Sequence, residues 1–316
     1  MTDKIKVGIS SCLLGLKVRY DGGHKYDPFL VRTLGEFVDY VPVCPEVEAG
    51  FPVPREAFRL IGSADAPRLV TQKTGSDVTE RMKQWAEERL NELETEGLCG
   101  FIFKSKSPSS GMERVKVYND RGVAEKTGTG IFARAFMHRF PQIPVEEDGR
   151  LQDIVLRENF IVRIFAYRRW KEWMVGEPSV SRLVEFHSRH KLLLMAHSPE
   201  LARALGKRVA GARETTPARL REDYLRQFLA ALTFKATAKK NTNVLMHMMG
   251  YFKKQLSADE KQELLQAIEN YRLGYVPLVV PLILIRHYVR KFDQKYLKEQ
   301  YYLEPHPLEL KLRNHA

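Results

Sequence analysis

Three short apolar runs in the first half of the chain each end in side chains that can do chemistry. The runs, each with the residues that follow it, are Lys6–Ser11 with Cys12, Tyr40–Val43 with Cys44 and Glu46, and Gly100–Lys104 with Ser107, Ser109 and Ser110. Thiolates bind soft metals and iron–sulfur clusters, a carboxylate can act as a general base on water, and a hydroxyl can pass a proton. If the runs are parallel strands, these groups share a cleft at one edge of a sheet. Alternatively, both thiols are packing residues, since cysteine is often buried.

The elements that must position these groups alternate between strands and helices over residues 1–148. A fourth strand is expected at Val115–Tyr118, and helices are expected at Phe29–Phe37 and Val78–Leu98. Apolar residues in the longer helix recur at helical spacing, which predicts one buried face. This alternation predicts a mostly parallel, Rossmann-like α/β domain.

From residue 149 to residue 316 the apolar residues follow a helical period in nearly every segment. The predicted helices include one beginning near Phe160 and others at Val184–His197, Arg219–Lys235, Val244–Tyr251, Asp259–Leu273 and Val279–Phe292. Short loops between such helices are typical of an all-α bundle. We therefore expect two domains, an α/β domain over 1–148 and an all-α domain over 149–316.

The net positive charge is confined to the second half of the chain. Residues 1–150 hold 22 Lys and Arg against 22 Asp and Glu, whereas residues 151–316 hold 29 against 17. A surface of that sign attracts polyanions, nucleic acid first, although a solvated basic face without a ligand is the alternative. The candidate RNA-binding residues are Arg168, Arg169, Arg189, Lys191, Lys239, Lys240, Lys253 and Lys254. His187 and His190 are interpreted as surface or phosphate-facing residues rather than zinc ligands.

The sequence also limits where the protein is expected to work. It has no run of about 18 apolar residues, which a membrane-spanning helix would need. The N-terminus lacks the apolar region of a signal peptide, and three cysteines argue against a disulfide framework. We expect a cytoplasmic protein with no membrane partner, and the sequence leaves its oligomeric state open.

Several motifs in the α/β half resemble those of the thiouracil desulfidase (TudS) family. In the family's order, they are Ser-Ser-Cys12-Leu-Leu-Gly, Arg19-Tyr-Asp21-Gly-Gly, Cys44-Pro-Glu46, Pro54-Arg55, Gly75-Ser-Asp-Val-Thr79 and Ser107-Pro-Ser-Ser-Gly111. The helical half resembles a YbgA-type domain in Phe165-Ala-Tyr-Arg-Arg-Trp170 and Asn243-Val-Leu-Met-His247. The combination resembles the larger, RudS-type desulfidases, which remove sulfur from 4-thiouridine in tRNA.

The resemblance implies an activity, a cofactor and roles for particular residues. The implied cofactor is a [4Fe-4S] cluster, whose one iron without a protein ligand binds the sulfur of the thiolated base. Water attacks the ring carbon, and no net redox change is needed. Cys12 and Cys44 match cluster ligands, Glu46 matches the acid/base carboxylate and Ser107 matches the catalytic hydroxyl.

The resemblance also places a base pocket near these residues, and the substrate remains open between several kinds. The residues expected to shape the pocket are Arg19, Asp21, Arg55 and Ser109. The substrate is tRNA in the first hypothesis and a free thiouracil or thiolated nucleotide in the second. In a third hypothesis the protein binds RNA without catalysis, and its cluster site is degenerate.

The third cluster ligand is the point at which this chain departs from the family. The family has a cysteine at the position of Ser110, and a serine oxygen is a harder ligand for iron than a thiolate. The remaining cysteine, Cys99, precedes the strand that leads to Ser107. Five strand residues would place it roughly 16 Å from the cleft. Cys99, Ser110 and an incomplete or external ligand all remain candidates.

Overall fold

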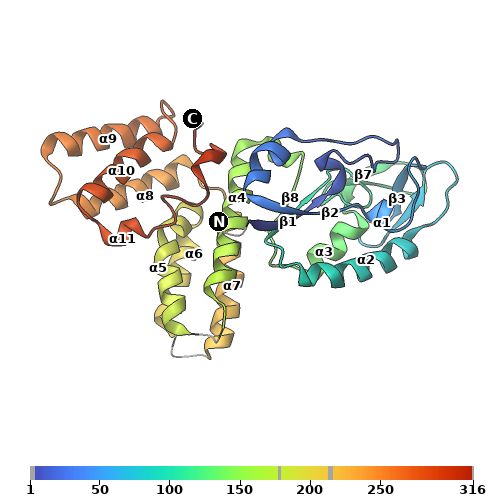
Figure 1. The fold of residues 1–316 in the computed structure, drawn as a ribbon, viewed down its shortest axis with the longest axis horizontal. Coiled ribbons are helices and arrows are strands. Elements are labelled where there is room, and N and C mark those ends of the chain that lie inside the picture. The colour runs from blue at the N-terminus through green and yellow to red at the C-terminus, as the bar shows by residue number, and fades with distance from the viewer. Residues whose placement is uncertain (1–3, 177–178, 213–215, 315–316) are drawn as a thin grey trace. The chain divides into compact units, whose positions relative to one another are not determined.

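The computed structural model describes residues 4–176, 179–212 and 216–314, and the chain forms two compact units. The units are Met1–Asp153 and Ile154–Ala316, and they divide a few residues beyond the boundary expected from the sequence. The predicted fold class is confirmed, because a parallel-dominated α/β region is followed by a mostly helical region (Figure 1).

The first sheet is entirely parallel and holds the three predicted strand ends. Its order is β2-β1-β5-β8, with β1 at Ile5–Ser10, β2 at Val38–Val43, β5 at Gly100–Phe103 and β8 at Val145–Glu147. Val7 of β1 pairs with Tyr40 on one side and with Gly100 on the other. The chain thus leaves β1 first to one side and later to the other, and ligands bind at such a switch point, outside the carboxyl ends of the strands.

A second sheet of the first unit was not predicted from the sequence, apart from its strand β6. Its order is β4-β3-β6-β7, with β3 at Phe58–Gly62, β4 at Pro67–Thr71, β6 at Val115–Tyr118 and β7 at Ala124–Gly128. The β3–β6 pair is parallel, whereas β3–β4 and β6–β7 are antiparallel.

Helices α1, α2 and α3 complete the first unit at Pro45–Glu48, Thr79–Thr95 and Ile131–Arg139. The predicted helical spacing in α2 is confirmed, because its buried face runs from Met82 to Leu93. Met82 packs in the core of the second sheet, whereas Leu90 and Leu93 pack in that of the first. The helix expected at Phe29–Phe37 is instead a short π turn, η2 (Phe29–Thr33), followed by a 3₁₀ turn, η3 (Leu34–Glu36).

The second unit is built from helices around one apolar core, as the sequence predicts. Its helices are α4 (Ile154–Trp173), α5 (Val180–His197), α6 (Pro199–Ala210), α7 (Pro217–Thr233), α8 (Ala238–Met249), α9 (Ala258–Arg272), α10 (Val279–Lys291) and α11 (Lys295–Lys298). Ser198, between α5 and α6, caps α6 by accepting a hydrogen bond from the backbone N–H of Leu201 at 3.3 Å.

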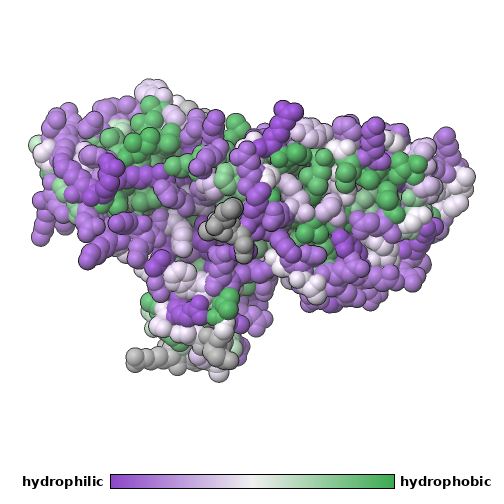
Figure 2. Space-filling model, viewed as in Figure 1, coloured by the Kyte–Doolittle hydropathy of each residue, from purple (hydrophilic) through white to green (hydrophobic). Residues whose placement is uncertain are grey.

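Hydrophilic residues cover most of the face drawn in Figure 2, with smaller apolar clusters between them. Among the described residues, no helix has both the length and the apolar character needed to cross a membrane.

Candidate active site

A pocket of about 450 Å³ lies at the carboxyl ends of β1, β2 and β5. The strand order explains this, because the three parallel strands are neighbours and end at the same edge of the sheet. The predicted residues that line the pocket are Cys12, Arg19, Cys44, Glu46, Arg55, Ser107, Ser109 and Ser110. The structure therefore brings together most of the chemistry-bearing side chains predicted from the sequence.

The two pocket thiols are positioned by turns that begin directly after their strands. Cys12 lies in the 3₁₀ turn η1 (Ser11–Leu14), and its carbonyl accepts a hydrogen bond from Lys25 N–H at 2.8 Å. Cys44 precedes α1 and donates its backbone N–H to Glu48 at 2.6 Å. Burial raises the pKa of Cys12 to about 11, and burial also raises the pKa of Cys44. Without a metal both residues are therefore neutral thiols at pH 7, and metal binding would displace their protons.

Glu46 accepts hydrogen bonds at both carboxylate oxygens. Its Oε2 accepts from Arg55 Nε at 2.8 Å and also from Arg55 Nη2, while Oε1 accepts from the Ser109 hydroxyl at 2.8 Å. The Arg55 side chain is 4% exposed and also donates to the carbonyl of Val18 at 3.0 Å. Arg55 therefore fixes the orientation of the Glu46 carboxylate and supplies its counter-charge.

A chain of hydroxyls continues from Glu46 to Ser107. The Ser109 and Ser107 hydroxyls are 3.0 Å apart. Ser107 Oγ also accepts from the backbone N–H groups of Ser109 at 3.3 Å and Ser110 at 3.1 Å. Because Ser109 donates to Glu46, its oxygen is the acceptor for the Ser107 hydroxyl. Ser109, expected only to shape the pocket, thus connects the two residues predicted to be catalytic.

The loop of residues 107–111, called the serine loop below, is fixed by hydrogen bonds from the first turn of α3. The sequence had not indicated that this helix contributes to the site. The backbone N–H groups of Phe132 and Ala133 donate to the carbonyl of Ser109 at 2.9 and 3.3 Å. Gly130 donates to the carbonyl of Gly111 at 2.8 Å. A Cβ atom at Gly130 would lie 2.6 Å from the Ser109 carbonyl, so only glycine allows this approach. The signal in the sequence was the pair of glycines just before this helix.

Cys99 lies outside the pocket, and this corrects its place among the candidate cluster ligands. Its backbone N–H donates to the carbonyl of Lys6 at 2.8 Å, near the start of β1, whereas Cys12 follows the end of β1. Cys99 is fully buried and does not line the pocket. The physical reason is that Cys99 directly precedes β5, whereas Ser107 follows the other end of that strand.

Two further residues differ from the sequence interpretation. Asp21 does not line the pocket, and its carboxylate instead accepts a hydrogen bond from Gly23 N–H at 3.0 Å. Lys104 does line it, with its ammonium 2.8 Å from Asp148. The Lys104 charge acts against burial by lowering the pKa of Cys12. Its position directly after β5 was the available signal.

A serine lines the pocket at the position where the resemblance leads us to expect a third cysteine. Ser110 lines the pocket and is 4% exposed. Within the described part of the chain, no group of three or more His, Cys, Asp or Glu side chains is arranged to hold a metal ion. The possible donors to an iron–sulfur group in this pocket are therefore the two thiols of Cys12 and Cys44 and the hydroxyl of Ser110, and thiolates are the ligands such a group needs.

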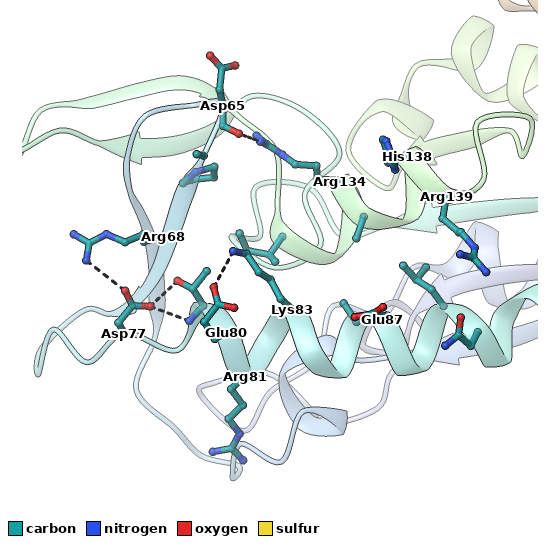
Figure 3. A pocket seen from close by; sticks show the side chains of 18 residues that line it. Asp65, Arg68, Asp77, Glu80, Arg81, Lys83, Glu87, Arg134, His138 and Arg139 are labelled. Carbon is teal, nitrogen blue, oxygen red and sulfur yellow. Dashed lines mark hydrogen bonds and ion pairs between the residues drawn. The ribbon is translucent and has the colours of Figure 1, made fainter.

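A larger cavity, about 1020 Å³, lies between α2 and α3 of the same unit (Figure 3). Several of its charged side chains already have partners in this unit. Lys83 pairs with Glu80 at 2.8 Å, Arg68 pairs with Asp77 at 3.4 Å, and Arg134 donates to the carbonyl of Asp65. It contains neither cysteine nor serine, so it does not compete with the thiol pocket as a catalytic centre.

The arginines predicted to bind RNA are mostly engaged inside the helical unit. Arg169 donates to the carbonyl of Pro305 at 2.9 Å and lies over the Tyr301 ring at 4.2 Å. Arg168 pairs with Glu172 at 2.6 Å, and Arg189 pairs with Glu185 at 2.8 Å. These contacts with Pro305 and Tyr301 make Arg169 a packing residue, which differs from the expected phosphate contact, and burial lowers its pKa to about 10.

Of the lysines predicted to bind RNA, one forms hydrogen bonds inside the helical unit and the others are exposed. Lys240 donates to the carbonyl of His197 at 2.6 Å and to that of Lys235 at 2.9 Å, so it caps the end of α5 rather than facing solvent. The exposed lysines, which form no ion pair with a described carboxylate, are Lys191, Lys239, Lys253 and Lys254.

Two family models match the chain, one in each unit. The model described as 2-thiouracil desulfurase matches residues 7–148, and that of a protein of unknown function, DUF1722, matches residues 191–307.

Curated relatives and a solved structure are also similar to parts of the chain. The uncharacterised protein YbgA of Escherichia coli (strain K12) is 33% identical over 161 residues, which covers 50% of this chain and 94% of YbgA. The uncharacterised protein YbbK of Bacillus subtilis (strain 168) is 33% identical over 131 residues, covering 40% of this chain and 85% of YbbK. The solved structure of the [4Fe-4S]-dependent thiouracil desulfidase TudS is 32% identical, covering 49% of this chain and 98% of TudS, with a TM-score of 0.39.

Proposed function

The chain belongs to the 2-thiouracil desulfurase family, with a YbgA-type domain fused behind the family domain, and on this premise we propose a specific reaction. The protein is proposed to hydrolyse the thiocarbonyl of a thiolated uracil, with 4-thiouridine in tRNA as the substrate. The water oxygen bonds to the ring carbon, the carbon–sulfur bond breaks, and sulfur leaves as sulfide. Because carbon keeps its oxidation state, the reaction requires no electron donor or acceptor.

The observation that carries this proposal is the hydrogen-bonded chain Glu46–Ser109–Ser107 in a pocket that also contains two thiols. The proposed cofactor is a [4Fe-4S] cluster, for which Cys12 and Cys44 would be thiolate ligands and Ser110, which lines the same pocket, is the candidate third ligand. When bound, such a cluster supplies an iron that acts as a Lewis acid toward sulfur.

The protein's own residues supply the proton transfers. Glu46 is the proposed base that takes a proton from the attacking water, and Arg55 keeps its carboxylate oriented. Ser109 donates to Glu46 and accepts from Ser107, so the proposed path carries protons between Glu46 and the Ser107 hydroxyl at the other end of this chain. Arg19, which lines the pocket, is the proposed contact to the ring.

The tRNA part of the proposal is supported by the charge of the second unit. All of the net charge, +12, comes from residues 151–316, and Lys239, Lys253 and Lys254 are exposed there. Lysines that neutralise phosphates bring most of the salt-dependent affinity for nucleic acid. A base inside folded tRNA would have to be turned out to enter the pocket.

The test uses the full chain reconstituted with iron and sulfide without oxygen, then mixed with tRNA containing 4-thiouridine or with free 4-thiouracil. We expect a brown protein and loss of the thiocarbonyl absorbance with tRNA. Glu46→Gln should keep the iron and lose about 10²–10⁴-fold in rate, as is usual for a general acid–base group. The matched control is Glu36→Gln, an exposed glutamate outside the pocket.

Each outcome tests a different part of the proposal. Turnover of free 4-thiouracil but not of tRNA would keep the desulfidase and remove the tRNA substrate. Salt-sensitive tRNA binding by a colourless, inactive protein would favour a non-catalytic RNA-binding protein, which the serine at position 110 makes the specific alternative. Full activity of Glu46→Gln would remove Glu46 from its role.

A further inference from the structure

A second pocket, of about 610 Å³, lies within the helical unit among α5, α6 and α8. We call it the tyrosine pocket, after Tyr251 in the 3₁₀ turn η6 (Gly250–Phe252) and Tyr296 in α11, which line one side. The remaining polar lining residues are His187, Ser188, Lys191, Arg203 and Asn243. No described carboxylate lines the pocket, so its charged groups are all basic.

The two cations of the tyrosine pocket are available to an anion. Lys191 on α5 and Arg203 on α6 are exposed, and neither forms an ion pair or hydrogen bond with a described residue through its side chain. Arg189, two residues before Lys191, is by contrast paired with Glu185 at 2.8 Å. Helices α5 and α6 pack against each other (Figure 1), and Lys191 and Arg203, one on each helix, line the same pocket. Lysine and arginine together are typical ligands of phosphate oxygens.

His187 adds a neutral donor at the inner wall. Its Nδ1 is 3.0 Å from the hydroxyl of Tyr224, whose ring is fully buried. Burial, and secondly the Lys191 charge, lower the pKa of His187 to about 4, so the ring is neutral at pH 7. Because a phenol hydroxyl is a donor to a neutral imidazole, we assign the ring proton to Nε2. This nitrogen faces α6, where a Cβ at Gly206 would be 3.6 Å away.

Part of the pocket lining is aromatic. The rings of Tyr251 and Tyr296 are stacked, with centroids 5.3 Å apart and an angle of 19° between their planes. Both tyrosines are half-buried, and the exposed amide of Asn243 lies in the same lining. Aromatic faces accept nucleobases by stacking, and an amide can donate to or accept from a base edge.

We propose that the tyrosine pocket binds one nucleotide, with its phosphate between Lys191 and Arg203 and its base against the tyrosine wall. A phosphate ion alone would leave most of the 610 Å³ and the aromatic wall without a contact, whereas this volume lies in the range of small-molecule sites. A nucleotide within an RNA strand and a free nucleotide share this chemistry. The inference does not require the desulfidase reaction, because it concerns binding alone.

The test measures binding to the full chain without added iron by isothermal titration calorimetry. The probes are uridine 5′-monophosphate, uridine, inorganic phosphate and a single-stranded decauridylate. Lys191→Ala with Arg203→Ala should weaken the nucleotide at least about tenfold, because each charged hydrogen bond to phosphate contributes to affinity. The matched control, Lys261→Ala with Arg290→Ala, removes one lysine and one arginine from α9 and α10 outside the pocket.

A second pair of variants blocks the pocket without removing a contact. Gly206→Leu places a side chain in the pocket, whereas Gly206→Ala adds only a Cβ at ordinary contact distance from His187. Both substitutions favour the α6 helix, so thermal melting should show a folded protein. We expect Gly206→Leu to abolish binding and Gly206→Ala to preserve it.

The outcomes separate the sources of the ligand. Binding of the monophosphate and not of uridine supports the proposal, and binding of the decauridylate alone assigns the site to an RNA strand. The proposal is overturned if neither nucleotide probe binds, if inorganic phosphate binds as tightly as the monophosphate, or if the Lys191→Ala, Arg203→Ala double variant and Gly206→Leu both bind like the wild type. Desulfuration can fail without affecting any of these results, because the thiol pocket lies in the other unit.

Discussion

The close approach of Gly130 to the serine loop makes a single methyl group a sensitive probe of the proposed proton path. A Cβ at residue 130 would lie 2.6 Å from both the C and the O atoms of Ser109, and 2.8 Å from the N atom of Gly111. All three contacts are to backbone atoms, so no side-chain rotation relieves them. Gly130→Ala must therefore displace the loop that carries Ser107 and Ser109.

The size of the displacement follows from these distances. Ordinary van der Waals contact begins near 3.4 Å, so Ser109 must move by about 0.8 Å. The Ser109–Glu46 hydrogen bond is 2.8 Å long, and a shift of that size away from Glu46 would lengthen it beyond hydrogen-bonding distance. We expect the rate of desulfuration to fall about 10²-fold, since a misplacement of about 1 Å has that effect, and the free energy of unfolding to fall by about 1–3 kcal/mol.

The assay combines turnover with thermal melting and iron content, so that a lost cluster is not mistaken for a lost proton path. The matched control is Gly35→Ala in the same unit, where a Cβ would lie 3.4 Å from its nearest neighbour, the carbonyl of Leu30. Ser109→Ala removes the hydroxyl without moving the loop and should also slow turnover. If Gly130→Ala is slow while Ser109→Ala turns over like the wild type, the path through Ser109 is refuted.

Three further predictions follow from the same contacts. Ser110→Cys should raise the iron retained after desalting, whereas Cys99→Ala should leave it unchanged; iron loss in Cys99→Ala without unfolding would contradict the position of Cys99 outside the pocket. Burial lowers the pKa of His197 from 6.5 to about 4, so as the pH falls the unfolded chain binds a proton at this residue before the folded chain does. The contribution of neutral His197 to the free energy of unfolding is complete above pH 6.5 and declines toward pH 4 by up to about 1.4 kcal/mol per pH unit. Urea unfolding of His197→Gln should therefore show a smaller decline over this pH range. Lys239→Ala with Lys253→Ala should weaken tRNA binding and flatten its salt dependence by about two counterions; an unchanged slope would place the tRNA elsewhere.

The convergence of Cys12, Cys44 and Ser107 could be predicted because it depends only on parallel strands ending at one edge. The position of Cys99 required the register, which pairs its end of β5 with the start of β1. The link through Ser109 depends on the conformation of the serine loop, which α3 holds in place, and the residues of the loop itself do not predict this conformation because the glycines that allow it precede α3.

The second sheet was missed because its strands lack a clear apolar alternation. β7 reads Ala-Glu-Lys-Thr-Gly and is mostly exposed, and Arg59 and Arg68 interrupt β3 and β4. His187 and His190 were expected at the surface, yet they are 9% and 0% exposed. Helix α5 contacts several other helices of the unit, so polar residues on more than one of its faces are enclosed, and periodicity does not reveal how many neighbours a helix has.

The attachment of the serine loop to α3 has a consequence for handling the protein. The loop that offers Ser107 and Ser110 to the pocket is fixed by backbone hydrogen bonds to helix N–H groups, and none of those bonds involves a thiol. Loss of iron from the proposed centre by exposure to air would therefore leave the backbone of the surrounding pocket in place. Protein purified aerobically should keep its melting temperature and regain its colour when it is reconstituted with iron and sulfide without oxygen, with no refolding step. Loss of colour during purification would then mean reversible loss of the cluster from a folded protein.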